Sequence, residues 1–425
     1  MKAPTRAILL SGLLVAAVVW SPLHAISSEP RLLYVAILSR HGVRSPTWSR
    51  DRLNGYSAQS WPGWGVPPGF LTPHGRLLMT LMGGYYGAWF ERDGLFADDR
   101  CASAKRVYIW ADTDQRTIET GRALAESIVR GCAIQVHSRA KGDNDPLFDP
   151  ISAGAVRLDA TTAAREIRSR IAPGLADRYR DAFAALDKVL DGNHGAAREG
   201  PFAHPVAPTA AARGRGISLS EPWSAASSLA EVLLLEYANG FPDREIGWGR
   251  LTKKDLGRIL ELHALYADLT RRTPVIARAR GSDLLAHLLA SIEQAGDGRA
   301  VRGALGAPGD LALVVVGHDT NQSNVSGLLG LTWKVPGYPR DDVPPGGALI
   351  FSLWRDSTGS AFVRTQYVAQ TPDQMRFAVR LTLVAPPAVQ DVAVPGCGRI
   401  PGHPACDLVT FSRIVRAAVD PAFVR

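Results

Sequence analysis

The sequence predicts an α/β protein whose sheet carries polar side chains at the carboxyl ends of its strands. Residues 32–38 and 311–316 are apolar, uncharged and of strand length, which is the pattern of strands buried on both faces. Residues 107–110 form a third such stretch. From about residue 152 to residue 293, Ala, Arg, Leu and Glu recur at helical spacing. This change predicts a mostly helical segment inserted between two parts of the sheet.

The first strand runs into a turn that carries three ionisable side chains. Gly42 frees the backbone and Pro46 lacks a donor, so the strand ends here. Arg40, His41 and Arg44 cluster at this point, where ligand sites of open α/β sheets lie. Guanidinium groups on both sides of an imidazole match phosphate or carboxylate oxygens. A His between two Arg also occurs on ordinary loops, so this turn alone leaves a catalytic role open.

The strand at residues 311–316 repeats this design. Gly317, His318 and Asp319 follow it directly, so an imidazole and a carboxyl group stand at its carboxyl end. If the two strands are neighbours, both imidazoles reach the same point at the edge of the sheet. Together the two strands predict a site that combines cations, imidazoles and an acid.

A helix is expected directly after the third strand at residues 107–110. Arg116 falls in the first turn of that helix, where free N–H groups and the positive end of the helix dipole favour anions. Asp112 and Gln115 have the spacing of a capping box. A surface arginine in a cap turn is the simpler interpretation of Arg116 alone, but the two other strand ends favour a shared anion site.

The remaining elements follow from periodicity and turn residues. Thr72 and Pro73 mark the start of a helix after a long loop rich in Gly, Pro and Trp. His263 and His287 fall on two expected helices, and we interpret both as structural. The expected helices span residues 161–172, 178–190, 227–238, 253–269, 282–294 and 408–418, and residues 348–354 and 362–368 are expected to pair as strands.

Six short pieces of the chain carry a family resemblance. In chain order they are RHGVRSP at residues 40–46, ADTDQRT at 111–117, DPLF at 145–148, GWGR at 247–250, GHDTN at 317–321 and PPGG at 344–347. They resemble the histidine acid phosphatases, in the bacterial periplasmic branch of phytases and glucose-1-phosphatase. The resemblance runs from about residue 31 to the C-terminus.

The resemblance implies a phosphoglycerate-mutase-like three-layer sandwich with a mainly parallel central sheet and an inserted, mostly helical cap domain. Residues 26–150 and 295–425 are expected to form the α/β catalytic domain, and residues 151–294 the cap domain. In the family such a cap covers the cleft and tunes the choice of substrate.

The resemblance also assigns roles in the hydrolysis of a phosphomonoester through a phosphohistidine. His41 is the implied nucleophile and Asp319 the implied proton donor. The groups implied to hold the phosphate oxygens are Arg40, Arg44, Arg116, Thr47 and His318. Nearby arginines lower the pKa of His41, and carboxylic acid is available at low pH, so we expect an acid optimum. No metal or other cofactor is implied.

The substrate is less sharply indicated. In the phytase branch a basic residue often follows the first motif, whereas here Trp48 takes that place, with Arg50 and Arg52 after it. Thr320 favours the phytase branch over the glucose-1-phosphatases. Trp48, Asp112 and Thr320 are candidate residues of the substrate pocket. We therefore expect a phytase-like enzyme that acts on inositol phosphates, with glucose-1-phosphatase or a broad-specificity acid phosphatase as the alternative.

Two further classes of protein are weighed against this one. A phosphoglycerate-mutase-like enzyme shares the first motif but relies on a Glu and is cytoplasmic, which disagrees with His318, Asp319 and the export signal described below. A periplasmic anion-binding protein without catalysis needs the arginines but no acid beside them. A zinc site is disfavoured because no closely spaced cysteine pair such as C-x-x-C occurs.

The amino terminus looks like a secretory signal. Lys2 and Arg6 precede an apolar run at residues 7–20, and Ala25 ends a suitable cleavage site. The run is short for a membrane span, and no Cys follows for a lipid anchor. We expect residues 1–25 to be removed and the mature protein to be periplasmic or secreted, without a membrane anchor and monomeric.

Charge and cysteines complete the sequence-based picture. Removal of Lys2 and Arg6 lowers the formal net charge from +8 to +6, which suits an acidic substrate and equally a generally basic surface. The basic residues are scattered without interleaved aromatics, so nucleic-acid binding is not expected. Four cysteines allow three pairings. The resemblance implies neighbour pairing, Cys101 with Cys132 and Cys397 with Cys406.

Overall fold

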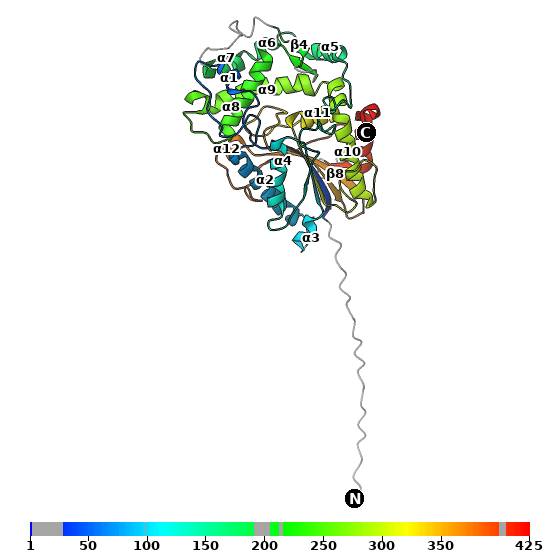
Figure 1. The fold of residues 1–425 in the computed structure, drawn as a ribbon. Coiled ribbons are helices and arrows are strands. Elements are labelled where there is room, and N and C mark those ends of the chain that lie inside the picture. The colour runs from blue at the N-terminus through cyan, green and yellow to red at the C-terminus, as the bar shows by residue number, and fades with distance from the viewer. Residues whose placement is uncertain (2–28, 98, 191–204, 212–215, 399–404) are drawn as a thin grey trace.

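The structure is a computed structural model, and it describes residues 1, 29–97, 99–190, 205–211, 216–398 and 405–425. Almost all of the predicted signal segment lies outside the described residues. The chain forms an α/β fold in which helices cover both faces of a central sheet and further helices lie beyond one edge of it (Figure 1). Within the described residues, no helix is both long and apolar enough to cross a membrane.

The central sheet is mixed. Its strand order is β10-β8-β7-β1-β6-β2-β3, and β9 pairs with β8. The strands are β1 Arg31–Arg40, β2 Val107–Ala111, β3 Val136–His137, β6 Ala312–Gly317, β7 Ala348–Arg355, β8 Ala361–Ala369, β9 Ala388–Asp391 and β10 Ala405–Asp407. β1, β6, β2 and β3 are parallel, whereas β7, β8, β9 and β10 pair antiparallel. The α/β fold class is confirmed, but the predicted parallel character holds only for β1, β6, β2 and β3.

The register of the parallel strands brings three chain segments to one edge of the sheet. Arg40 at the end of β1 lies opposite Gly317 at the end of β6, and Ala111 at the end of β2 lies opposite Val316. The loops that follow these strands therefore begin side by side. β1 and β6 are almost wholly buried, which explains their unbroken runs of Val, Leu, Ile and Ala.

Helices cover the sheet on both faces (Figure 1). α2 and α4 pack on each other on one face, and α10, α11 and α13 pack together on the other. These and the short helices are α1 Arg50–Asn54, α2 Pro73–Arg92, α3 Arg100–Ala104, α4 Gln115–Ile128, α10 Pro274–Asp297, α11 Asp319–Leu329, α12 Pro372–Arg376, α13 Leu408–Ala418 and the 3-10 turn η4 Pro421–Phe423. The hydroxyl of Thr72 accepts a hydrogen bond from Gly75 N, so the predicted cap of α2 is confirmed.

The helical segment predicted between the two parts of the sheet lies above the strand ends in Figure 1. It contains α5 Ala160–Arg170, α6 Leu175–Arg178, α7 Arg180–Leu190, β4 Pro208–Ala210, β5 Ile217–Leu219, α8 Trp223–Ala238, η3 Ile246–Gly249 and α9 Lys253–Arg271. α10 begins at Pro274, eight residues before the predicted start at 282, with Thr273 as its N-cap residue and the proline at its first position, where proline is tolerated. α10 thus crosses the predicted domain boundary, and the division into two domains stays a prediction.

Both predicted disulfides are present. Cys101 bonds Cys132 and thereby ties α3 to the segment after α4. Cys397 bonds Cys406 and ties β10 to the loop before it. Among the described residues no cysteine is free. Each bond closes a modest loop, which typically stabilises a fold by about 2 to 4 kcal/mol.

Glu236 on α8 leads to a first prediction, on stability. Its side chain is fully buried, one oxygen accepts a hydrogen bond from Gly247 N at 3.0 Å, and burial raises its pKa to about 8. In the unfolded chain the pKa is near 4.5. The protonated carboxyl thus stabilises the fold fully below about pH 4.5, and this stability is lost as the pH rises through 8.

We expect the free energy of unfolding to fall by roughly 3 to 5 kcal/mol over this range because of Glu236. Glu236→Gln should remove that part of the pH dependence, since an amide does not titrate. Urea unfolding of both proteins at about pH 5 and about pH 8 measures the difference. An equal change in the free energy of unfolding of wild type and variant between these two pH values would show that Glu236 is ionised in the fold.

Candidate active site

His41 lies where the parallel strands end. Its backbone N donates to the carbonyl oxygen of Gly317 at 2.9 Å, and its own carbonyl oxygen accepts from Gly346 N at 2.9 Å. Arg40 N likewise donates to Gly347 O. Two neighbouring segments, the end of β6 and the loop before β7, therefore fix the backbone around the imidazole at the edge of the sheet.

The His41 ring offers one unprotonated nitrogen. Nδ1 lies 2.9 Å from the carbonyl oxygen of Gly42, which only accepts hydrogen bonds, so Nδ1 carries the proton and Nε2 does not. Burial and the charges on Arg116, Arg40 and Arg44 hold the pKa of His41 well below its usual value. The predicted effect of the neighbouring arginines is in this direction, and burial adds to it. The ring therefore stays neutral in acid medium.

Glu231 on α8 joins two of the predicted phosphate-binding arginines. Arg40 Nη2 bonds one of its oxygens, and Arg44 Nη2 bonds the other at 2.9 Å. Burial alone would raise the pKa of Glu231, but Arg44 and Arg40 lower it to about 2. The ionised carboxylate fixes both guanidinium forks beside His41. All three of these side chains are at least four-fifths buried.

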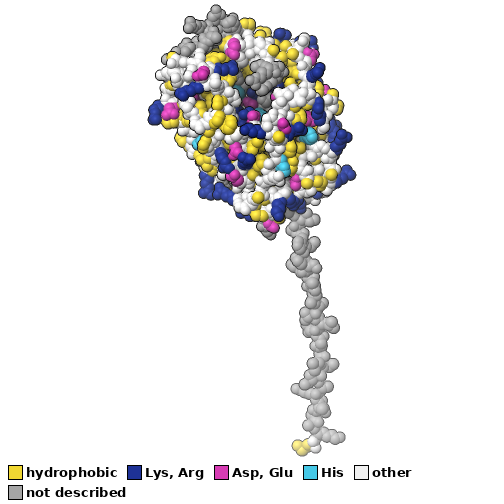
Figure 2. Space-filling view, viewed as in Figure 1, with side chains coloured by type: hydrophobic (Ala, Val, Ile, Leu, Met, Phe, Trp, Pro, Cys, Tyr) yellow, Lys and Arg dark blue, Asp and Glu magenta, His cyan; other side chains and the backbone are white. Residues whose placement is uncertain are grey.

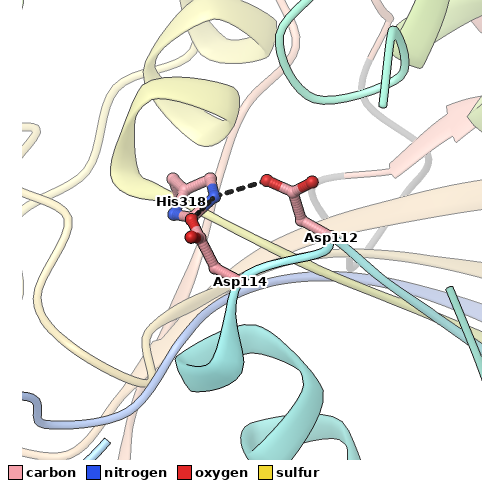
Figure 3. A group of neighbouring side chains, drawn as sticks. All are labelled: Asp112, Asp114 and His318. Carbon is pink, nitrogen blue, oxygen red and sulfur yellow. Dashed lines mark hydrogen bonds and ion pairs between the residues drawn. The ribbon is translucent and has the colours of Figure 1, made fainter. Parts of the chain in front are cut away.

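His318 is held by two acidic side chains of the turn between β2 and α4 (Figure 3). Its Nε2 donates to Asp112 Oδ2 at 2.6 Å and lies 3.5 Å from Asp114 Oδ2. The centroids of the His318 and His41 rings are 5.5 Å apart. The two strands thus bring both imidazoles to one point, as the sequence predicts.

The capping box predicted from Asp112 and Gln115 is wrong. Asp114 is the N-cap residue of α4, and the Gln115 side chain accepts from Leu71 N at 2.9 Å. One oxygen of Asp112 accepts from Thr113 N, and the other accepts from the distant His318 ring. Asp112 therefore orients an imidazole instead of capping a helix, a pairing that local spacing does not reveal.

Arg116 reaches the same cluster from the first turn of α4, as predicted. Its Nη2 bonds Asp114 Oδ2 at 2.6 Å, and its side chain is 18% exposed. Asp112, Asp114 and His318 have ligand atoms within 4.8 Å of one another, a spacing that suits a metal ion. Both carboxylates of this cluster are engaged by other side chains, Asp112 by His318 and Asp114 by Arg116.

Asp319 begins α11 and faces cationic groups. Its Oδ2 lies 2.6 Å from Arg271 Nη1, 3.8 Å from His263 Nε2 and 3.9 Å from Arg40 Nη2. Burial alone would raise the pKa of Asp319, but Arg271, Arg40 and His263 hold it well below its usual range. The direction of this pKa shift is opposite to the expectation that low pH alone supplies a proton at Asp319.

The two predicted threonines lie at the rim of the site. Thr47 is exposed and, like the Arg116 guanidinium, borders Gly69. Thr320 N donates to Asp319 Oδ1 at 2.8 Å. Thr47 thus stands near a cation at the entrance, whereas Thr320 fixes the second carboxylate oxygen.

Trp48 forms an aromatic and cationic stack on the rim. Its ring lies 5.5 Å from the ring of Tyr56, and the Arg52 guanidinium lies 3.6 Å from the Trp48 ring centroid. Position 48 itself carries no basic residue, but Arg52 places a guanidinium against the face of the Trp48 indole.

This chain is similar to several known proteins. The family model of the histidine phosphatase superfamily, branch 2, matches residues 31–182. Phytase AppA of Escherichia coli (strain K12) is 36% identical, with 93% of this chain and 94% of that protein covered. Hafnia alvei phytase, solved with tartrate and with myo-inositol hexakis sulphate, is 36% identical, with TM-scores of 0.86 and 0.84 and coverage of 93% of this chain and 99% of that chain.

This chain belongs to branch 2 of the histidine phosphatase superfamily. It is a histidine acid phosphatase, phytase-like in sequence and fold. Glucose-1-phosphatase of Salmonella typhimurium is also similar, at 26% identity over 91% of this chain and 92% of that protein.

Sequence reasoning missed three residues of this phosphatase site, all on α8 and α9. Glu231 had a usable signal, because Glu231 and Glu236 are the two charged residues of the otherwise uncharged helix at residues 223–238. His263 was interpreted as structural, but its Nε2 faces Asp319 while Nδ1 contacts Ser227. Arg271 ends a polar helix and had no signal.

Proposed function

We propose that this phosphatase hydrolyses phosphomonoesters through a phosphohistidine formed on His41. The observation that carries the proposal is a neutral, buried imidazole whose unprotonated Nε2 stands beside three fixed guanidinium groups. Such a group is a competent nucleophile toward phosphorus, and arginines stabilise the charge that develops on the oxygens. Arg40, Arg44, Arg116 and His318 are the proposed ligands of the phosphoryl oxygens.

Asp319 is the proposed proton donor to the leaving oxygen and the proposed base for the water that cleaves the phosphohistidine. It lies 3.9 Å from Arg40, on the side of the site that faces α9. The charge of the phosphoryl group is balanced by side chains, so no metal is needed in this proposal.

For the substrate we propose an inositol polyphosphate. Several relatives that are 34–36% identical to this chain are named phytases, and one of them was solved with myo-inositol hexakis sulphate. A cavity of about 550 Å³ is lined by Trp48, Arg52, Glu221 and hydroxyl groups such as those of Ser224 and Ser228. Ser224, Ser228 and Glu231 follow one another at helical spacing, so the cavity lies along the same face of α8 as the carboxylate that bonds Arg40 and Arg44. Its hydroxyl groups and the Arg52 guanidinium suit a phosphorylated polyol.

Arg52 provides a test of this substrate. We expect Arg52→Ala to lower kcat/KM for phytate by about fivefold, since a partly exposed ionic contact is worth about 1 kcal/mol. Turnover of p-nitrophenyl phosphate should stay within about twofold, because that substrate has no second phosphate. Arg50→Ala, at an exposed position of the same short helix, is the matched control. An equal loss on both substrates would remove Arg52 from the substrate pocket.

The reaction itself is tested with pure protein. Release of p-nitrophenol from p-nitrophenyl phosphate between about pH 4 and 8, around the carboxyl and imidazole titrations, separates an enzyme from an anion-binding protein. Comparison of phosphate release from phytate and from glucose 1-phosphate then decides between the phytase and the glucose-1-phosphatase alternatives. Faster release from glucose 1-phosphate at equal concentration would overturn the phytate proposal.

We also propose that the mature enzyme is an exported monomer with a cap domain. Two disulfides support an oxidising compartment. On the face shown in Figure 2, basic and acidic side chains are interspersed, which suits a small anionic substrate better than a nucleic acid. Mass determination of the secreted protein would reveal whether residues 1–25 are removed.

A further inference from the structure

Arg271 is an unassigned side chain that touches the proposed acid. It lies at the last residue of α9, two residues before Thr273, which precedes α10. A basic residue at a helix end usually interacts with the helix dipole and water. Arg271 instead has 16% of its side chain exposed, and its Nη1 lies 2.6 Å from Asp319 Oδ2. The short connection to α10 fixes the direction in which the guanidinium enters the site.

The groups around Asp319 disfavour protonation of its carboxylate before substrate binds. Oδ1 accepts from Thr320 N, and Oδ2 faces Arg271, His263 and Arg40. A protonated Oδ2 would have to donate, and two of the three groups that it faces, Arg271 and Arg40, are guanidinium groups that cannot accept.

Two other carboxyl groups oppose this effect. Glu231 on α8 and Asp342 in the loop before β7 both disfavour a charge on Asp319. Asp342 is buried, and Arg40 and His263 interact with it as well. The state of Asp319 is therefore a balance between Arg271, Arg40 and His263 on one side and two carboxyl groups on the other, and a change of local charge shifts it.

This arrangement does not fit a proton donor, Asp319, that is already protonated before the substrate binds. We propose that Arg271 is a positioning residue that holds Asp319 as a carboxylate before substrate binds, and that the negative charge of the arriving phosphoryl group makes Asp319 take up the proton it later donates. The inference rests on the proposed role of Asp319. It adds to that role the origin of the proton and the residue that controls it.

The proton balance is as follows. A phosphoryl dianion binds to Arg40 and its neighbours, and one proton from solvent goes to Asp319. The His41 Nε2–phosphorus bond forms, the phosphorus–oxygen bond breaks, and the leaving oxygen keeps that electron pair and takes the proton from Asp319. The regenerated carboxylate pairs with Arg271 again. It then accepts a proton from the water whose oxygen bonds to phosphorus as the nitrogen–phosphorus bond breaks, and it returns that proton to solvent when the phosphate leaves.

Binding of inorganic sulfate tests this without turnover, because sulfate remains a dianion and is not hydrolysed. If binding takes up a proton, the sulfate Kd rises with pH, by up to about tenfold per pH unit for one linked proton. We expect this rise in wild-type protein between about pH 4 and 7, measured by calorimetry. Asp319→Asn should show a shallower rise, by about one proton.

Arg271→Gln should move the pH range of proton uptake to higher pH, because the carboxylate of Asp319 loses its main cationic partner. Arg271→Lys should restore the original range in part. Arg258→Gln removes the same charge from α9 about 20 Å along the axis and should leave the range unchanged. Equal pH slopes in wild type and Asp319→Asn would overturn the proposal. So would an Arg271→Gln protein that binds sulfate more weakly by the same factor at every pH, which would make Arg271 a plain anion ligand.

Failure of this inference is distinct from failure of the proposed function. An enzyme that turns over p-nitrophenyl phosphate but shows no proton uptake on Asp319 retains the phosphatase mechanism and loses only the role of Arg271. Thermal unfolding of each variant checks that its fold is kept.

Discussion

His41→Ala is expected to lower kcat for p-nitrophenyl phosphate by at least about 10³-fold. The proposed reaction forms a covalent bond to this imidazole, and among the described residues no other imidazole takes the same position at the end of β1. His318 is the only other described imidazole whose ring lies within 5.5 Å, and its Nε2 is bonded to Asp112. The remaining arginines still bind phosphate, so sulfate binding should persist in the variant.

A matched substitution separates chemistry from folding. His287→Ala removes an imidazole from α10, where His287 bonds Gly303 O and lies near Asp283. We expect turnover within about twofold of wild type for this variant. If His41→Ala retains more than about a tenth of wild-type kcat, the phosphohistidine on His41 is excluded.

The same imidazole predicts the pH profile. Burial and three arginines hold the pKa of His41 well below 6.5, so the ring remains unprotonated as the pH falls through 6.5. Activity of wild type should therefore not decline when the pH is lowered through this value, as it would for an ordinary histidine nucleophile. A fall in kcat/KM centred near pH 6.5 that is the same in two different buffers would contradict this electrostatic picture.

The way in which each site residue is positioned decides whether it could be predicted from the sequence. His41 and His318 follow uncharged buried strands, and strands of this kind neighbour one another in few ways, so their meeting was predictable. Arg116 was predictable because a strand and a helix start bracket it. In each case the local sequence fixes both the element and the position of the side chain at its end.

Glu231, His263 and Arg271 depend instead on tertiary packing. They lie on α8 and α9, whose rotation about their own axes over the strand ends is set by contacts between segments far apart in the chain. A polar residue on such a helix looks the same in sequence whether it faces water or a buried arginine. The failed capping box at Asp112 has the same origin, because a long-range partner replaced the local one.

Asp319→Asn is expected to have an effect that depends on the leaving group. An alkyl phosphate such as glycerol phosphate or phytate releases a basic alkoxide, which needs a proton, and loss of a general acid typically costs about 10² to 10⁴-fold. p-Nitrophenolate is stable without a proton, so its release should slow by no more than about tenfold. The asparagine keeps the shape of the side chain and the contact with Thr320 N, so the ratio of the two losses isolates proton donation from positioning. Equal losses on both substrates would mean that Asp319 orients Arg40 and Arg271 and donates no proton, and the acid would then have to be sought among the other carboxyl groups that face the site, Asp342 foremost.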